Sequence, residues 1–284
     1  MTSAIHKVAM MLDRRGGRTL LGFLATLRAR AGTEKDIRVF YDDGWIQQVD
    51  THYLVTSRNF VFQPWGPPDT AIARLHQACS EYWFHLYTPR SGDVIIDVGA
   101  GNGSDVIVFA DLVGEHGRVI AIEAHPATFR LLRKQCELNG LRTVIPLKLA
   151  VTDTKRMVYI DDCANDDLNR ISSKPSRPHL AEAVQGVPLD QICREQGITR
   201  VDLLKMNIEG AERYALDGME ETLFRTRHVC IACHDFLAEG SDREELRTRD
   251  LVIERLRRYG FHVTLRSDDF RDYVRYHVHG ARLE

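Results

Sequence analysis

The ten residues VIIDVGAGNG, which begin at Val94, constrain the fold of this chain more than any other segment. The apolar run predicts a buried strand, and the glycines that alternate from Gly99 predict a tight turn. Glycine adopts positive φ at little cost and has no side chain to keep a ligand from the backbone. A second apolar run starts at Val106 and predicts a helix. This order predicts an α/β fold with a ligand site at the carboxyl end of a parallel strand.

The glycine spacing favours one class of ligand. A dinucleotide site has G-x-G-x-x-G, with a pyrophosphate on the helix N-terminus. Here Asp97 precedes a G-x-G-x-G series. A carboxylate at this position suits an amine-bearing or cationic ligand, and S-adenosylmethionine carries both an amino group and a sulfonium. The motif resembles the first motif of class I methyltransferases. An NAD-type nucleotide-dependent oxidoreductase is the alternative, because it also begins with a strand, a glycine turn and a helix.

Length and composition exclude several classes of protein. The chain has 284 residues and a formal net charge of −2, which gives no electrostatic reason to expect a nucleic-acid partner. No apolar run is long enough to span a membrane, and the N-terminal segment reads as an amphipathic helix rather than a signal peptide. The six cysteines are dispersed, and Cys230 and Cys233 read as free, buried thiols of a strand. We therefore expect a cytoplasmic protein without a bound metal, and the sequence allows a homo-oligomer.

Two regions are expected. Residues 1–88 predict an N-terminal helical and hairpin cap, with a turn at Asp42-Asp43-Gly44 and a helix from Ala71 to about Tyr87. Residues 89–284 alternate between strands and helices, which predicts a mostly parallel sheet. A helix opened by a capping box at Ser241 is expected to run to Arg258. The later strands are expected at residues 118–122, 147–151, 201–206, 228–233, 261–266 and 273–279. With the first strand they make a Rossmann-like sheet of seven strands, as in a class I methyltransferase.

Carboxylates at strand ends supply further candidate cofactor contacts. Glu123 ends the second strand, where it is placed to accept hydrogen bonds from both hydroxyls of a ribose. Asp153 follows the expected third strand and is placed to accept from an adenine amino group, although a plain turn aspartate explains it as well. The predicted cofactor-binding residues are Asp97, Gly99, Ala100, Gly101, Asn102, Gly103, Glu123, Ala124, Ala150, Val151, Asp153 and Asn207.

Three later motifs resemble the FkbM family of S-adenosylmethionine-dependent methyltransferases. They are VPLD from Val187, VDLLKMNIEGAE from Val201 and ALDG from Ala215, and they follow one another in the family's order. The resemblance covers about residues 90–235 and implies transfer of a methyl group to a hydroxyl, often of a natural product or a sugar-containing metabolite. One position departs from the family pattern: Asn207 replaces the usual aspartate, which puts a role for a negative charge there in doubt.

The catalytic residues are harder to identify than the cofactor site. His234 follows the expected fifth strand and is a candidate general base, because an unperturbed histidine is largely neutral at pH 7. The other candidates are Asn207, Glu209 and Lys205, with Lys205 expected to pair with Glu209. The polar segment 161–178 is a candidate substrate lid. The expected partner is a small hydroxylated acceptor, and a non-catalytic binding protein is the alternative that Asn207 suggests.

Overall fold

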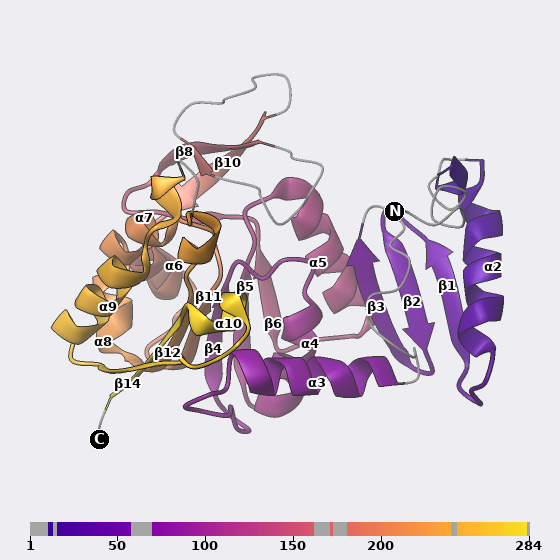
Figure 1. Ribbon diagram of the computed structural model, residues 1–284, viewed down its shortest axis with the longest axis horizontal. Helices are drawn as coiled ribbons and strands as arrows, with labels where there is room; N and C mark the ends of the chain where they lie inside the picture. Colours follow the sequence, from indigo (N-terminus) through magenta and orange to yellow (C-terminus); the bar gives the residue numbers. More distant parts are fainter. Residues whose placement is uncertain are drawn as a thin grey trace.

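The computed structural model describes residues 11–13, 16–57, 70–161, 171–172, 181–239 and 243–282. Figure 1 shows a central sheet with helices on both sides, a second small sheet at one edge of this layer, and a helix-backed hairpin at one end of the molecule. The described strands form sheets of seven, four and three strands. The α/β architecture is therefore the one that the alternating pattern predicts.

The central sheet has the strand order β13-β14-β12-β11-β4-β5-β6, in which β14 alone runs antiparallel to its neighbours. This order confirms the expected class I methyltransferase fold. The order reverses between β4 and β11, and ligands of open α/β sheets bind at such a switch point. The strands are β4 (Val94–Val98), β5 (Arg118–Ile122), β6 (Val144–Leu147), β11 (Val201–Met206), β12 (Thr226–Ala232), β13 (His262–Leu265) and β14 (His277–Ala281).

Two apolar cores hold the helices on the two faces of the central sheet. One core packs α3, α4 and α5 against residues such as Ile95 and Leu203, and the other packs α6 to α9 against their neighbours Ile96 and Leu204. Successive residues point to opposite faces of a strand, which is why strands buried on both sides read as continuous apolar runs. The helices are α3 (Ala71–Tyr82), α4 (Ser104–Val113), α5 (Pro126–Leu138), α6 (Leu189–Glu195), α7 (Glu212–Asp217), α8 (Glu220–Phe224) and α9 (Arg249–Arg258).

The N-terminal part forms a helix-backed hairpin sheet, as expected. Its elements are α2 (Arg18–Arg30), β1 (Ile37–Tyr41), β2 (Trp45–Val49) and β3 (His52–Ser57). Asp43 adopts a φ of 53° in the turn between β1 and β2. Side chains of α5 bind the backbone of β3: Gln135 accepts from the amide of Val55 at 2.7 Å, and Asn139 accepts from that of Tyr53 at 2.9 Å. The boundary at residue 88 stays a prediction, since α3 already packs in the core of the central sheet.

The expected third strand is wrong in its position. The third strand of the central sheet is β6, Val144–Leu147, whereas Ala150–Val151 forms β7 of the four-stranded sheet β7-β10-β8-β9. Leu147, Leu149 and Val151 alternate as if in one strand, but the backbone changes partner between them: Thr152 donates to Val187 of β10 at 3.1 Å. The rest of this sheet is β8 (Arg156–Asp161), β9 (Ile171–Ser172) and β10 (Ala181–Val187).

Three further boundaries differ from expectation. The helix α3 ends at Tyr82 rather than near Tyr87, and the expected strand 273–279 is the short helix α10 (Asp272–Arg275) followed by β14. The helix expected from a capping box begins only at Arg249. Its first amides donate instead to the carboxylate of Asp235, with Thr248 N at 3.2 Å. The proposed capping residue, Ser241, lies outside the described residues.

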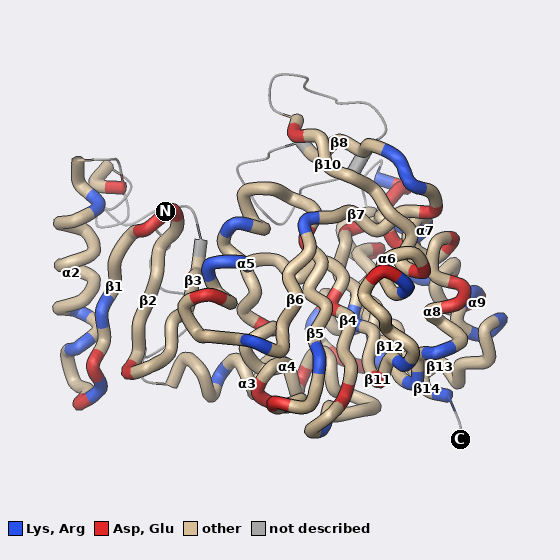
Figure 2. Tube along the Cα trace, turned by 180° about the vertical axis from the view of Figure 1, so that it is seen from behind, with Lys and Arg blue, Asp and Glu red and all other residues tan. Residues whose placement is uncertain are grey.

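The surface carries both signs of charge. Figure 2 shows Lys and Arg interspersed with Asp and Glu along the chain, in keeping with the net charge of −2. Among the described helices, none has the length and apolarity that a membrane span requires. Most of the expected lid, residues 162–170 and 173–178, lies outside the described part of the chain.

Candidate active site

The carboxyl ends of four parallel strands bring most of the predicted residues to one edge of the sheet. The glycine turn follows β4, Glu123 follows β5, Asn207 follows β11, and His234 comes two residues after β12. Backbone hydrogen bonds join these ends: the amides of Gly99 and Ala100 donate to Ile122 at 2.9 and 3.0 Å, and that of Asn207 donates to Val98 at 2.9 Å. The strand ends thus form one connected surface.

The three glycines of the turn have different surroundings. All have positive φ, with values of 80°, 58° and 85° for Gly99, Gly101 and Gly103. A Cβ on Gly99 would lie 2.0 Å from the carbonyl oxygen of Asn207, and one on Gly103 would lie 2.8 Å from a methyl group of Leu132. At Gly101 no heavy atom of the described residues lies within 4 Å of the Cβ position. Packing against backbone therefore requires glycine at position 99, whereas the contact at Gly103 is with the end of a flexible side chain and Gly101 lies clear of the described residues.

Asp97 pairs with a lysine inside the sheet. The Nζ of Lys205 lies 2.7 Å from Oδ1 of Asp97 and donates to the carbonyl oxygen of Gly99 at 3.0 Å. Both side chains are buried, with 0% and 2% exposed for Asp97 and Lys205. The other carboxylate oxygen of Asp97, Oδ2, is buried and accepts no hydrogen bond from the described residues. The pair therefore fixes the first residue of the turn and leaves one acceptor unused.

The surroundings of Lys205 keep it charged. Burial lowers the pKa of its ammonium, but the carboxylates of Asp97 and Asp105 raise it more, so that the pKa lies above its usual range. Asp105 lies 3.8 Å away, and the ring of Trp83 lies 4.9 Å from Nζ. Burial raises the pKa of Asp97, and Lys205 opposes that shift. The expected pairing of Lys205 with Glu209 is wrong, because the cross-strand register places Lys205 directly beside Asp97.

Glu123 accepts two backbone hydrogen bonds. The amide of Gly101 donates to Oε2 at 2.9 Å, and that of His125 donates to Oε1 at 2.8 Å. Each carboxylate oxygen can accept a second bond, and Glu123 remains partly exposed. Burial by its surroundings raises its pKa to about 7, against the two amides that lower it. The two amides thus fix the orientation of the Glu123 carboxylate, and each of its oxygens can still accept a hydrogen bond from a ligand.

Asn102 serves the turn and the N-terminal sheet. Its Nδ2 donates to the carbonyl oxygens of Val55 and Thr56 at 2.8 and 2.9 Å, and its Oδ1 accepts from the hydroxyl of Ser104 at 2.9 Å. The amide is therefore occupied by protein partners. These bonds link β3 to the glycine turn, and the predicted contact of Asn102 with a cofactor stays a prediction.

We expect Asn102→Ala to lower the free energy of unfolding by about 1–3 kcal/mol, because it leaves two carbonyl oxygens and a serine hydroxyl without their partner. Chemical denaturation measures this loss. Asn139→Ala is a matched control, since it also removes an amide that binds β3 but lies away from the turn. The assigned role is wrong if only Asn102→Ala leaves the stability unchanged.

The structure brings some of the residues predicted around the adenine close together. Ala124 packs against the small core that contains Ala150, so these two lie together. The side chains of Ala150 and Val151 are buried, which leaves their backbone as the part that can meet a ligand. Asp153 forms an ion pair with Arg156 and sits beside Gly218. Its predicted bond to an adenine stays a prediction.

In the segment 207–212, which follows β11, the side chains of Asn207 and Glu209 are partly exposed and that of Glu212 is buried. Asn207 has a buried Oδ1 without a hydrogen-bond partner, and Glu209 adopts a φ of 53°, a left-handed conformation that is unfavourable outside glycine. Such strain concentrates at functional sites. Glu212 is fully buried and accepts from the amide of Gly210 at 2.9 Å and the hydroxyl of Thr248 at 3.1 Å. Glu212 therefore holds the backbone around Asn207 and Glu209 in place.

His234 lies at the same sheet edge with one free nitrogen. Its Nδ1 is buried without a hydrogen-bond partner, and burial lowers the pKa of the imidazole to about 4. The ring is therefore neutral at pH 7. A pKa of about 4 makes it a weak proton acceptor, since the best general bases have a pKa near the working pH. The neighbouring Asp235 is engaged in capping α9.

The sequence interpretation missed the residues that support the Asp97–Lys205 pair. Trp83 donates from Nε1 to Asp105 at 3.0 Å, and Cys79 contacts the same carboxylate at 3.5 Å. Asp105 stands in the first turn of α4, where an acid is favourable. Its position after the glycine turn was the one available signal, while Trp83 comes from a helix whose contact with the sheet no local pattern reveals.

Comparison with known proteins places this site in a family. Residues 97–263 match the family model described as the methyltransferase FkbM domain. The 31-O-demethyl-FK506 methyltransferase FkbM of Streptomyces tacrolimicus is 28% identical over 217 residues, which cover 66% of this chain and 79% of that protein. The 2-O-methyltransferase NoeI of Sinorhizobium fredii is 28% identical over 153 residues, which cover 48% of this chain and 61% of that protein.

A solved structure gives a weaker likeness. The methyltransferase FkbM from Methylobacillus flagellatus superposes with a TM-score of 0.45 and 14% sequence identity, over 75% of this chain and 54% of that chain. The matched region of the family model includes the glycine turn, the strand end at Glu123 and the block after β11.

Proposed function

Because the chain belongs to the FkbM family of S-adenosylmethionine-dependent methyltransferases, we propose that it transfers the methyl group to a hydroxyl of a small molecule. The acceptor class is a natural product or a sugar-containing metabolite. The names of the two relatives support oxygen as the accepting atom, since both are O-methyltransferases. Family membership does not favour the NAD-type oxidoreductase that the glycine turn alone allowed.

The open space at Gly101 carries the assignment of the cofactor site. In the part of the chain that the structure describes, no heavy atom lies within 4 Å of a Cβ at Gly101, although Gly99 and Gly103 on either side have close neighbours. Gly101 lies between Asp97, which has a free buried Oδ2, and Glu123, which has free acceptor capacity. These groups fit a cofactor with an amino group at one end and a ribose at the other. Asp97 would bind the amine and Glu123 the ribose hydroxyls.

Lys205 has a supporting part in this assignment. Its ammonium forms an ion pair with the Asp97 carboxylate and donates a hydrogen bond to the Gly99 carbonyl oxygen, so it stabilises the turn from inside the sheet. Its ammonium is thereby engaged by protein groups, and the carboxylate of Asp105 lies 3.8 Å away as a further partner. We therefore assign it a positioning role rather than the catalytic role expected from the sequence.

The bound cofactor supplies an electrophilic methyl group, and the residues of the protein must align the acceptor with it. Good alignment can lower a barrier by roughly 7–11 kcal/mol. Asn207 and His234 face the same sheet edge, and each has a buried atom without a partner, Oδ1 and Nδ1. We propose that these atoms accept hydrogen bonds from the acceptor and orient its hydroxyl. Glu209, strained and partly exposed beside them, is the candidate for taking the hydroxyl proton.

The proposed function is tested by incubating the full chain with methyl-labelled S-adenosylmethionine and a library of hydroxylated small molecules. Label is expected in a methyl ether, and calorimetric titration is expected to detect S-adenosylhomocysteine but not NAD. Binding of NAD without binding of S-adenosylhomocysteine would overturn the assignment. Cofactor binding without transfer to any acceptor would favour the non-catalytic alternative.

The affinity for S-adenosylhomocysteine is expected to fall about tenfold between pH 8 and pH 6. The pKa of Glu123 is raised to about 7, so its carboxylate is charged above that pH and protonated below it. Ribose hydroxyls donate to the charged form, and binding therefore strengthens as the pH rises through 7. Calorimetry at both pH values measures the change. Glu123→Gln should bind more weakly with little pH dependence, and an unchanged pH profile in this variant would contradict the assignment.

A further inference from the structure

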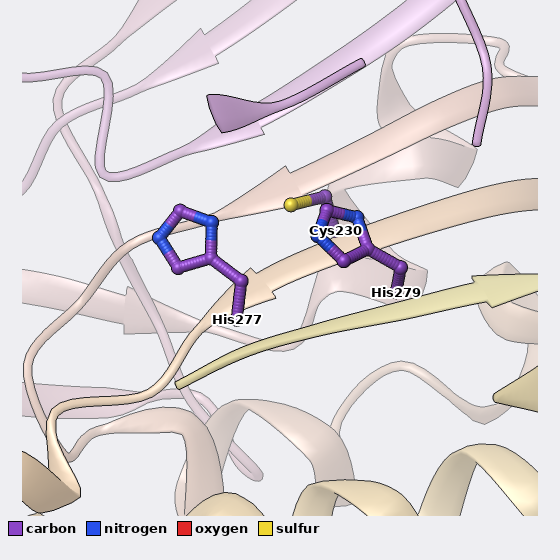
Figure 3. Close-up of side chains that lie close together, drawn as sticks. All are labelled: Cys230, His277 and His279. Atoms are coloured by element: carbon purple, nitrogen blue, oxygen red, sulfur yellow. The ribbon is translucent and has the colours of Figure 1, made fainter. Parts of the chain in front are cut away.

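A cluster of two histidines and a cysteine lies inside the protein, beside the row that contains the Asp97–Lys205 pair. Cys230 of β12 and His277 and His279 of β14 are buried, and one candidate ligand atom of each lies within 4.8 Å of the others. Figure 3 shows the two rings and the sulfur gathered on one side of the strands. The register explains the cluster: Cys230 is opposite His279, and His277 is two residues earlier on the same face.

Two polar groups of the cluster are poorly satisfied by the described residues. The Nε2 of His279 is buried and has no hydrogen-bond partner among them. The thiol of Cys230 donates a long hydrogen bond of 3.8 Å to the carbonyl oxygen of Tyr82. Burying such groups without partners costs free energy, and most buried polar groups in proteins are satisfied. A ligand that bonds to these atoms would remove the deficit.

His277 is oriented as metal-binding histidines are. Its Nδ1 lies 3.2 Å from the carbonyl oxygen of Tyr82, which can only accept, so Nδ1 carries the hydrogen and Nε2 carries the lone pair. A backbone carbonyl that binds the second ring nitrogen is the usual support of a histidine ligand. The ring also stacks on Trp83, with centroids 5.0 Å apart and planes 7° apart. Its lone pair therefore has a fixed direction.

Both histidines of the cluster are buried. A third imidazole stands next to them: the ring of His85 lies 4.9 Å from that of His279 and is exposed to solvent. The exposed His85 side chain would have to turn toward the cluster to supply a fourth ligand, and its place at the surface provides a route of entry for an ion.

We propose that Cys230, His277, His279 and His85 bind one transition-metal ion that prefers thiolate and imidazole ligands, with zinc as the preferred ion. On binding, the thiol of Cys230 loses its proton to solvent and the sulfur bonds to the ion. Tetrahedral zinc holds ligand atoms roughly 3.5 Å apart, so small side-chain rotations must draw the cluster together. No oxidation or reduction is involved.

The neighbouring charges are compatible with this site. Burial raises the pKa of the Cys230 thiol to about 12, and the nearby cations Lys205 and Arg266 act against that rise. Each already has a carboxylate partner, Asp97 at 2.7 Å and Asp269 at 2.8 Å, which moderates repulsion of the metal. Bound metal would fix the segment that follows α3 onto β12 and β14, next to Trp83 and Lys205.

Cobalt(II) binding to the full chain, freed of metals with a chelator, tests the proposal. One equivalent is expected to bind and to give the near-ultraviolet absorption of a thiolate-to-cobalt charge transfer, which zinc should then displace. Cys230→Ala should abolish this absorption, and Cys193→Ala, which removes a buried thiol of α6 away from the cluster, should retain it. Absence of the band in the unaltered chain, or its loss in both variants, would overturn the proposal.

A second variant tests the same site independently, in case Cys230→Ala does not fold. His279→Gln keeps the thiol and is expected to weaken zinc binding at least tenfold, measured by competition with a chelator. His228→Gln is the control. His228 belongs to the neighbouring strand β12 and stacks on Tyr87 outside the cluster, so its replacement should leave the affinity for zinc unchanged. Equal affinity in the unaltered chain and His279→Gln would show that the cluster is not the binding site.

Discussion

Lys205→Met is expected to lower the free energy of unfolding by about 3–5 kcal/mol, the usual result when one partner of a buried ion pair is removed. Asp97 is fully buried and has no other cation at hydrogen-bond distance among the described residues. Without Lys205 the carboxyl group must either stay charged in an apolar surrounding or take up a proton. The carbonyl oxygen of Gly99 also loses its donor. Urea denaturation at pH 7 measures the change.

Two matched variants separate this effect from a general loss of charge. Lys35→Met removes an exposed lysine that lies 2.7 Å from Asp50, and it should cost less than about 1 kcal/mol. The double variant Asp97→Leu/Lys205→Met should recover part of the stability, because an apolar pair of similar volume often replaces a buried ion pair without loss. A cost of Lys205→Met no larger than that of Lys35→Met would show that the pair contributes little.

The gathering of the predicted site residues at one edge of the sheet was predictable because its signals are local. Each signal can be recognised from a short stretch of sequence. They are the alternation of Ile95 and Ile96 between two cores, the glycines after β4 and the carboxylate after β5. Parallel strands share a carboxyl edge, so these local signals also place Glu123 and Asn207 beside the turn. The fold class followed from the same reasoning.

The failures concern contacts between distant segments. Lys205 was expected to pair with Glu209, four residues away, whereas the register of β11 with β4 pairs it with Asp97. The same register continues from Lys205 to Cys230 and from Cys230 to His279, which creates a buried polar row that no sequence spacing reveals. The third strand was misplaced because an alternating apolar pattern does not show where the backbone changes sheets.

Gly99→Ala is expected to lower the free energy of unfolding by about 4 kcal/mol or more, in the range that marks a severe steric conflict. The new methyl group would lie 2.0 Å from the carbonyl oxygen of Asn207, and backbone on both sides is held by sheet hydrogen bonds. Relief would require β4 and β11 to separate at their carboxyl ends. Chemical denaturation should detect the loss, together with loss of the cofactor.

Gly101→Ala is the matched control, because it adds the same methyl group at a similar backbone conformation. Its φ of 58° makes the substitution cost about 1–2 kcal/mol, but no heavy atom lies within 4 Å of the new carbon. If the cofactor occupies that space, this variant should stay folded and lose affinity for S-adenosylhomocysteine at least tenfold in calorimetry. Retained affinity in a folded Gly101→Ala would place the cofactor elsewhere. Equal stability of the two variants would contradict the steric role of Gly99, so the pair tests separately what the turn needs to fold and what it needs to bind.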